Sequence, residues 1–317
     1  MGYAGLLRLG NCIMAFLGVL TGAVVESLMF FSLFNLADYP PTLGWLVFFD
    51  TPLWSALSLI SHFQTYPIVS VVLAGVAAFL VTGAGNALND YYDRDLDKKA
   101  HPERPLPSGE VTPKGAWNFA MVLFAVGLVI SLLVNFLCLL IAIVNTYVLF
   151  AYERKYKARG LSGNLSISYL TASVFLFGGA SVLSFKFVPI LFLLALLANV
   201  GREITKDIED VEADAKYRRT LPMTTSKEGA ARTATRYIWL AVYFSFVPMF
   251  YLVVFPDLGL KLILYLIIVV VADAIFIYSC RFVMKDPKRA QTLMKIGMAM
   301  AIVSFFICGL IPYPMNV

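Results

Sequence analysis

The chain has 317 residues, of which 60% are hydrophobic and only 14% are charged, and its formal net charge is +5. A water-soluble domain of this size does not bury so large an apolar share, because soluble compositions lie nearer half apolar and a quarter charged. The composition excludes an ordinary soluble protein and indicates a membrane protein. The basic residues lie at the ends of apolar runs, which indicates orientation in a membrane rather than nucleic-acid binding.

Apolar runs long enough to cross a bilayer recur along the whole chain. The run between residues 116 and 151 is too long for one helix, and we divide it near Asn135. These runs predict an all-α, polytopic membrane protein with about nine spans. The expected spans are 9–34, 67–88, 116–133, 135–151, 167–184, 187–203, 236–255, 259–280 and 293–312.

The distribution of lysine and arginine predicts the orientation of these spans. With nine spans, all of the 25 basic residues except Lys186 and Lys261 fall on the side of the N-terminus. Basic residues concentrate in cytoplasmic segments. We therefore expect a cell-membrane protein with a cytoplasmic N-terminus, an external C-terminus and an active site that opens to the cytoplasm.

A connection at about residues 35–66 is expected on the external face, since it contains no lysine or arginine. Its apolar and aromatic stretches, which include Trp45 and Trp54, suit an interfacial helix or loop. We assign no chemistry to this connection.

The cytoplasmic end of the second span is rich in acidic and amide side chains. Asp90, Asp93 and Asp97 are spaced i, i+3 and i+7, so on a helix they share one face. Asn86 lies one turn before Asp90 on that face, and Asn89 lies one turn before Asp93.

The same spacing returns at the end of the sixth span. Asp207, Asp210 and Asp214 repeat it, with Glu203 in the place that Asn86 holds in the first copy. One such cluster is as consistent with a solvated helix end as with a binding site. Two copies on the same predicted side favour a functional pair.

Like charges stacked on one helical face repel one another, and the free-energy cost of this repulsion rises near a bilayer. A divalent cation removes this conflict, because Mg²⁺ takes one or two carboxylates together with substrate phosphates and waters. The two clusters therefore predict a Mg²⁺–diphosphate site, with Mg²⁺ as the cofactor.

In these motifs the chain resembles the UbiA superfamily of intramembrane prenyltransferases. Its N-D-x-x-D-x-x-x-D pattern is matched from Asn89 to Asp97, and the R-P-x-P-S-G pattern from Arg104 to Gly109. A Tyr/Lys-containing segment before Gly163-Asn164 and the second D-x-x-D-x-x-x-D at Asp207 come next, in the family's order. The resemblance implies one transmembrane domain over residues 1–317, with helices around a central cavity and cytoplasmic motif loops at about 89–115 and 204–235.

The segment from Arg202 to Asp210 resembles the archaeal digeranylgeranylglyceryl phosphate synthase branch of that superfamily. That resemblance implies Mg²⁺-dependent transfer of a prenyl chain from geranylgeranyl diphosphate to the hydroxyl of geranylgeranylglyceryl phosphate, a step of archaeal ether-lipid synthesis. The implied partners are this prenyl diphosphate and a lipid acceptor, and the sequence indicates no protein partner.

We expect the aspartates to bind metal and the polar side chains around them to bind substrate. A phosphate-bearing acceptor would need cations away from the metal, for which Arg8, Lys155 and Lys157 are candidates. The expected catalytic residues are Asp90, Asp93, Asp207 and Asp210, and the expected metal ligands are these four with Asp97 and Asp214. The expected substrate-binding residues are Arg8, Asn11, Asn86, Asn89, Arg94, Arg104, Lys155, Lys157, Asn164, Arg202 and Lys206.

Two alternatives stay open. One is a prenyltransferase of the same superfamily that uses an aromatic acceptor, as in quinone or haem pathways. The other is a membrane cation transporter, which would be expected to have charged residues in the middle of the membrane. Within the predicted spans, Glu26 and Asp273 are isolated acidic residues and form no such group. Both acidic clusters lie at helix ends on one predicted face, which argues against a conduction path.

Overall fold

The structure is a computed structural model, and it describes residues 2–33, 67–185, 187–214, 219–250 and 259–310. The described residues form helices and contain no β-strand, apart from one isolated bridge between Arg159 and Arg219. The expected external connection at 35–66, with Trp45 and Trp54, lies outside the described residues. The all-α prediction is confirmed.

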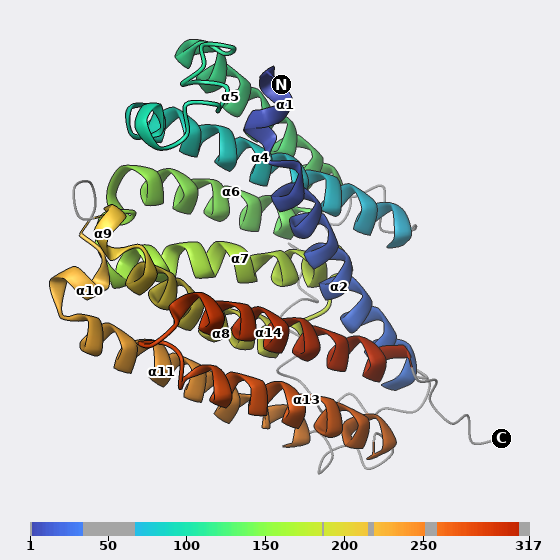
Figure 1. The fold of residues 1–317 in the computed structure, drawn as a ribbon. Helices are drawn as coiled ribbons and strands as arrows, with labels where there is room; N and C mark the ends of the chain where they lie inside the picture. Colours follow the sequence, from blue (N-terminus) through green and yellow to red (C-terminus); the bar gives the residue numbers. More distant parts are fainter. Residues whose placement is uncertain (1, 34–66, 186, 215–218, 251–258, 311–317) are drawn as a thin grey trace. The chain divides into compact units, whose positions relative to one another are not determined.

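The long helices follow the predicted apolar spans (Figure 1). Their bounds are α2 Leu9–Leu33, α4 Pro67–Ala100, α5 Pro113–Val134, α6 Phe136–Ala151, α7 Leu161–Ser181, α8 Val188–Glu209, α11 Lys227–Phe244, α13 Gly259–Ser279 and α14 Pro287–Leu310. The short elements are α1 Gly2–Leu7, the π-helix η2 Tyr152–Tyr156, α9 Val211–Asp214, α10 Leu221–Thr224 and the 3₁₀ turn η3 Val247–Met249.

Seven of the described helices are long and apolar enough to cross a membrane. Residues Ile263–Ser279 of α13 form a shorter apolar helix. The predicted span 236–255 is not one continuous helix, because α11 ends at Phe244 and the 3₁₀ turn η3 follows; residues 251–258 lie outside the described part. The chain is thus a multi-pass membrane protein, while the count of nine spans stays a prediction.

The chain forms two compact units. Unit 1 contains residues 1–23, 34–153 and 174–184, and unit 2 contains residues 24–33, 154–173 and 185–317. The boundaries therefore fall within α2, η2 and α7, and Glu153 is the last residue of its stretch of unit 1. A single domain over 1–317 and a central cavity stay predictions.

In unit 1, α4 packs against α5 and α6 (Figure 1). Small residues on α4 and α5, among them Ala84, Ala116 and Ala120, are buried in the core together with Leu88 and Phe124. The α5–α6 break lies at Asn135, whose Oδ1 accepts from the Cys138 amide at 2.8 Å and whose Nδ2 donates to the Ala180 carbonyl at 2.9 Å. The predicted division of the 116–151 run is confirmed, because this side chain caps the new helix.

The ends of α2 and α7 that belong to unit 1 approach each other backbone to backbone. A Cβ on Gly22 would meet the Phe175 carbonyl oxygen, and a Cβ on Gly178 would meet the Val19 carbonyl oxygen. Small residues of this kind allow close helix packing in a membrane.

In unit 2, α8 packs against α11 and α14, and α13 packs against α14. Residues of α8 such as Val200 and Ile204 meet Ala234 and Ile238 of α11 in its core. The N-terminus of α8 is bound by Glu26 of α2, whose Oε1 accepts from the Phe187 and Val188 amides at 2.8 and 2.7 Å. A membrane-depth carboxylate is here paired with a helix N-terminus, which suits its negative charge.

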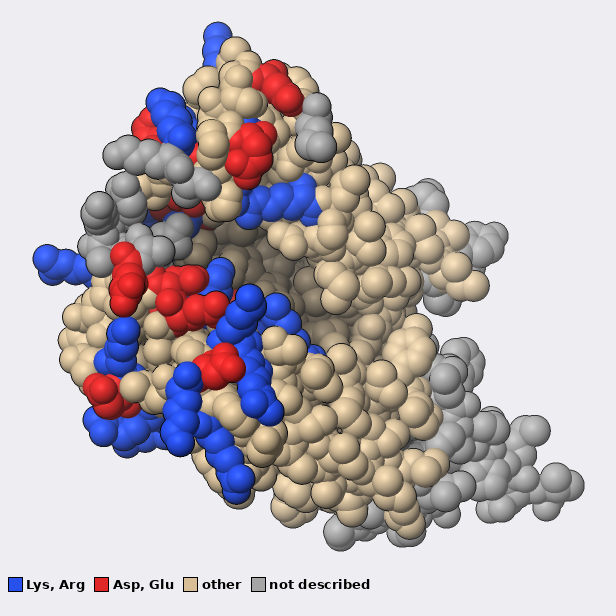
Figure 2. Space-filling view, viewed as in Figure 1, with Lys and Arg blue, Asp and Glu red and all other residues tan. Residues whose placement is uncertain are grey.

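The charged side chains visible in Figure 2 gather near the ends of the helices that carry the acidic motifs, and the visible helix flanks are almost free of charge. This distribution suits helices that expose their flanks to lipid and their motif ends to water.

Candidate functional site

The first acidic motif lies on α4, which continues as one helix through the motif to Ala100. The first predicted motif loop, about 89–115, is thus helical at its start. Asp90 and Asp97 are only 3% and 6% exposed, and Asp93 is half-buried. The three aspartates stand on one helix, as their spacing predicts, and two of them are withdrawn from solvent.

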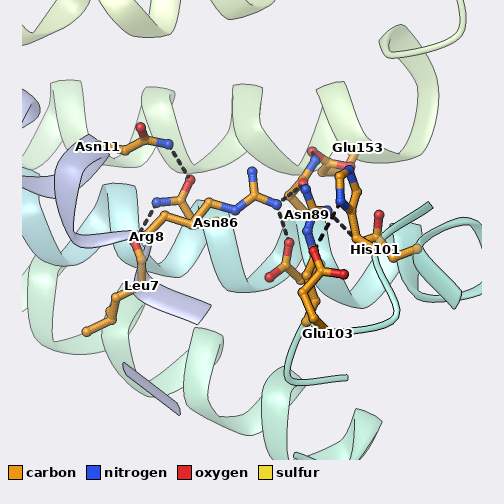
Figure 3. Close-up of polar contacts among 11 residues, drawn as sticks. Leu7, Arg8, Asn11, Asn86, Asn89, His101, Glu103 and Glu153 are labelled. Atoms are coloured by element: carbon orange, nitrogen blue, oxygen red, sulfur yellow. Dashed lines mark hydrogen bonds and ion pairs between the residues drawn. The ribbon is translucent and has the colours of Figure 1, made fainter. Parts of the chain in front are cut away.

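Arg8 contacts this motif directly. It lies between α1 and α2 with a φ of 48°, a left-handed conformation that is uncommon for a residue other than glycine. Its Nη2 forms an ion pair with Asp90 and lies 3.2 Å from Asn89 Oδ1 (Figure 3). The expectation that Arg8 lies away from the predicted metal ligands was wrong, because the helix break turns its side chain onto α4.

The same helix junction involves two further predicted residues. Asn86 Nδ2 donates to the Leu7 carbonyl at 2.7 Å, and its Oδ1 accepts from Asn11 Nδ2 at 3.4 Å (Figure 3). Asn86 and Asn11 therefore tie the N-terminal helix break to α4, next to the position of Arg8.

Glu153 also belongs to this site, although the sequence did not single it out. Its Oε1 accepts a hydrogen bond from Asn89 Nδ2 at 2.9 Å (Figure 3). The sequence gives only a weak indication of this role. Glu153 is a single acidic residue, and it lies beside Lys155 and Lys157, which are the predicted substrate-binding residues of that segment.

The loop after α4 folds back onto Asp97. Arg104 Nη1 donates to Asp97 Oδ2 at 2.7 Å, and Leu106 and Val111 of the same loop are buried. Near the start of the loop, His101 Nδ1 lies 3.3 Å from Glu103 Oε1. The Glu103 backbone amide, aided by His101, holds the pKa of that carboxyl below its usual range.

Arg94 is directed to its own neighbours on α4. Its Nη1 donates to the Tyr91 carbonyl at 2.9 Å, its guanidinium lies 4.9 Å from the centre of the Tyr91 ring, and Asp95 is nearby. Among its described contacts none joins it to Asp90, Asp93 or Asp97.

The second acidic motif lies in unit 2 and is not one continuous helix. Asp207 is on α8, but α8 ends at Glu209, and Asp210 is its C-terminal cap with φ −89° and ψ 5°. Asp214 ends the separate helix α9, and its side chain lies outside the described residues. The expectation that all three share one helical face was therefore wrong for this copy, because the backbone leaves the helix at Asp210.

The first turn of α7 is held against the second motif. The buried Asn164 donates from Nδ2 to Asp207 Oδ2 at 2.9 Å. The Gly160 amide, in a left-handed turn with φ 51°, donates to the Arg219 carbonyl at 3.1 Å. Lys155 is exposed with Nζ 5.5 Å from the centre of the Tyr156 ring, and Lys157 is half-buried.

The remaining predicted residues of unit 2 lie on α8. Arg202 forms an ion pair with its neighbour Glu203, and Lys206 is exposed. Glu209, on the same helix, accepts from Gln291 Nε2 at 2.6 Å.

Each unit therefore supplies carboxylate and amide oxygens at a helix end, together with basic side chains. This donor set suits Mg²⁺, which prefers oxygen ligands and shares them with substrate phosphates. Within the described part of the chain, no three acidic, histidine or cysteine side chains are already grouped around one point. Arg8 and Arg104 instead neutralise Asp90 and Asp97.

Comparisons with known proteins identify the family of the chain. Residues 51–306 match the model of the UbiA prenyltransferase family. A digeranylgeranylglyceryl phosphate synthase from Methanosarcina mazei is 40% identical over 276 residues, which cover 85% of this chain and 92% of that protein.

Two solved structures are also similar. One, from work on digeranylgeranylglyceryl phosphate synthase in membranes, has 32% identity and a TM-score of 0.75 and covers 97% of both chains. A UbiA homologue from Archaeoglobus fulgidus bound to GPP and Mg²⁺ has the same fold, with 15% identity and a TM-score of 0.62 over 98% of this chain and 99% of that one. The chain belongs to the UbiA prenyltransferase family.

Proposed function

We propose that the protein transfers the geranylgeranyl group of geranylgeranyl diphosphate to the free hydroxyl of geranylgeranylglyceryl phosphate. The observation that carries this proposal is the 40% identity to a digeranylgeranylglyceryl phosphate synthase across 92% of that protein. The bond between C1 of the prenyl chain and the diphosphate oxygen breaks, and C1 bonds to the acceptor oxygen. The products are the diether, diphosphate and the proton of the acceptor hydroxyl.

Mg²⁺ is the proposed cofactor, and the donor set of the two motifs supports it. Asp90 and Asp93 of unit 1 and Asp207 and Asp210 of unit 2 are the proposed ligands, with Asp97 and Asp214 completing the two sets. When bound, Mg²⁺ would act as a Lewis acid that stabilises negative charge on the leaving diphosphate. Arg104, which contacts Asp97 Oδ2, would compete with an ion for that carboxylate.

The polar residues around the aspartates have separable proposed roles. Asn164 orients Asp207, and Asn86 with Asn11 holds the helix break that brings Arg8 to Asp90. Asn89 and the cations Arg94, Arg104, Arg202 and Lys206 would bind diphosphate, since charge stabilisation at the leaving group is the main requirement. Lys155 and Lys157 would bind the phosphate of the acceptor.

A product assay tests this function. Purified protein in lipid vesicles receives radiolabelled geranylgeranyl diphosphate with geranylgeranylglyceryl phosphate or with an aromatic acceptor. We expect a labelled diether only with the glycerol phosphate, and no product when EDTA removes Mg²⁺. A prenylated aromatic product would instead establish the aromatic-acceptor alternative.

The acidic residues are tested in the same assay. Asp90→Asn and Asp207→Asn should each lower turnover by at least about a hundredfold, because a lost charge stabilisation of about 3 kcal/mol corresponds to that factor. The melting temperature of each variant serves as the control for folding. Normal turnover in either variant would contradict a metal site that uses both motifs.

A further inference from the structure

One acidic residue beside the first motif has no place in the reaction described so far. Glu153 lies in the π-helix η2, and its Oε1 is 2.9 Å from Asn89 Nδ2. Both residues belong to unit 1, and both are half-buried. Short π-helical turns are rare in proteins, and those that do occur are often found at functional sites.

The chemistry of this contact fixes the direction of the Asn89 amide. An ionised carboxylate only accepts hydrogen bonds, so the NH₂ group of Asn89 must face Glu153. The Oδ1 atom then faces the opposite side, where Arg8 Nη2 lies at 3.2 Å (Figure 3). Glu153 on one side and Arg8 on the other therefore select a single orientation of the Asn89 amide, although its oxygen and its NH₂ group have nearly the same shape.

The orientation of this amide also affects the neighbouring metal ligand. Asn89 is adjacent to Asp90, and the same Arg8 nitrogen contacts both side chains. In this orientation of the amide, Asn89 Oδ1 and Asp90 Oδ1 both accept from Arg8 Nη2. A flipped amide would place its NH₂ group against Arg8, where two donors would oppose each other.

We propose that Glu153 is a positioning residue of the first motif, which holds the Asn89 oxygen toward Arg8 and Asp90 as part of the Mg²⁺–diphosphate site. The inference rests on the proposed function, because it assigns Glu153 to that same site. Glu153 acts through Asn89 and not as a base or a metal ligand, so it needs only a hydrogen-bond acceptor and not a negative charge.

Four variants separate this role from others. Glu153→Ala removes the acceptor, whereas Glu153→Gln keeps one in its amide oxygen. Asn89→Asp places two carboxylates against each other, and Asn89→Asp combined with Glu153→Gln restores a hydrogen bond with donor and acceptor exchanged. Glu103→Ala, which removes an exposed carboxylate outside the motif, is the matched control.

The primary measurement is equilibrium binding of an unreactive geranylgeranyl thiolodiphosphate to vesicle-bound protein over a range of Mg²⁺ concentrations, with the melting temperature alongside. We expect Glu153→Ala to weaken binding by up to about tenfold, as for one lost hydrogen bond. Glu153→Gln should restore binding, Asn89→Asp should weaken it further, and the double variant should recover most of that loss. Glu103→Ala should bind as the unchanged protein does.

Three results would overturn the inference. They are unchanged binding in Glu153→Ala, a loss in Glu153→Gln as large as in Glu153→Ala, or a double variant no better than Asn89→Asp. If Glu153→Ala does not fold, the comparison of Asn89→Asp with the double variant still decides. Absence of diether product from the unchanged protein would refute the proposed function and leave these binding comparisons independent of it.

Discussion

At the scale of single residues, the first motif is held by a side chain that lies far from it in the sequence. Arg8 is 82 residues from Asp90 and reaches it through a left-handed backbone conformation. Such a conformation in a residue other than glycine costs on the order of 1–3 kcal/mol and persists only where the surroundings enforce it. Here the hydrogen bond of Asn86 to the Leu7 carbonyl helps to enforce it.

The Arg8–Asp90 ion pair leads to a prediction about metal affinity. In the absence of substrate, a cation that binds Asp90 competes with the guanidinium for the same carboxylate. Arg8→Gln should therefore bind Mn²⁺, a spectroscopic substitute for Mg²⁺, several-fold more tightly in the substrate-free protein, as one charge-assisted contact of about 1 kcal/mol implies. Electron paramagnetic resonance titration measures this affinity.

Arg94→Gln is the matched control for this titration, because the Arg94 guanidinium contacts Tyr91 and Asp95 rather than Asp90. Equal or weaker Mn²⁺ binding in Arg8→Gln than in Arg94→Gln would show that Arg8 does not compete with the cation.

At the scale of elements, α8 depends on α2 for its start. Phe187, the residue before α8, gives it no side-chain cap, and Glu26 of α2 accepts from the Phe187 and Val188 amides instead. Since Glu26 is 1% exposed, water cannot replace it there. The helix that carries Asp207 is therefore fixed at its other end by a distant carboxylate.

Removal of this cap should destabilise the protein. Glu26→Ala leaves two amides without their acceptor, at about 1–3 kcal/mol for each buried unpaired group. Glu26→Gln keeps an oxygen acceptor and should lose less. Thermal unfolding in detergent measures both, and equal melting temperatures for Glu26→Ala and the unchanged protein would contradict the capping role.

The glycines between α2 and α7 set a second element-scale requirement. Gly178→Val should lower the melting temperature strongly, because its side chain would collide with backbone atoms of α2 rather than with a movable side chain. We expect a loss of roughly 1–3 kcal/mol or more, as for overpacking.

Gly10→Ala is the control for this substitution, since a Cβ at Gly10 meets no atom within 4 Å. It should be neutral or slightly stabilising, because alanine favours a helix more than glycine does. A Gly178→Val protein as stable as Gly10→Ala would show that the two helices can separate at no cost.

At the scale of the whole molecule, the proposed orientation follows from charge. All basic residues except Lys186 and Lys261 fall on one predicted side, so the N-terminus is proposed to be cytoplasmic and the C-terminus external. Alkaline phosphatase fused after Val317 should be active outside the cytoplasm of a bacterial host, and a fusion after the basic residue Arg289 should be inactive. The opposite pattern, or activity at both points, would refute nine spans in this orientation.

The sequence predicted where helices lie better than where they begin and end. Hydropathy marks only the part of a helix that meets lipid, so α11 and α14 begin several residues before the predicted spans 236–255 and 293–312. The early start of α11 depends on its cap, Ser226, whose Oγ accepts from the Gly229 amide at 2.9 Å. The break at Asn135 was predictable, because the apolar run was too long and an asparagine interrupts it.

The sequence by itself determined the membrane class, the all-α fold and the two aspartate motifs, because lipid burial and helical spacing depend on composition and local order alone. Only the tertiary structure decided the partners of those motifs: Arg8 for Asp90, Glu153 for Asn89 and Asn164 for Asp207. These partners come from segments distant in the chain, and no local pattern records them. The tertiary structure also shows that α8 ends at Glu209. The two motifs therefore have the same sequence spacing but different backbone conformations.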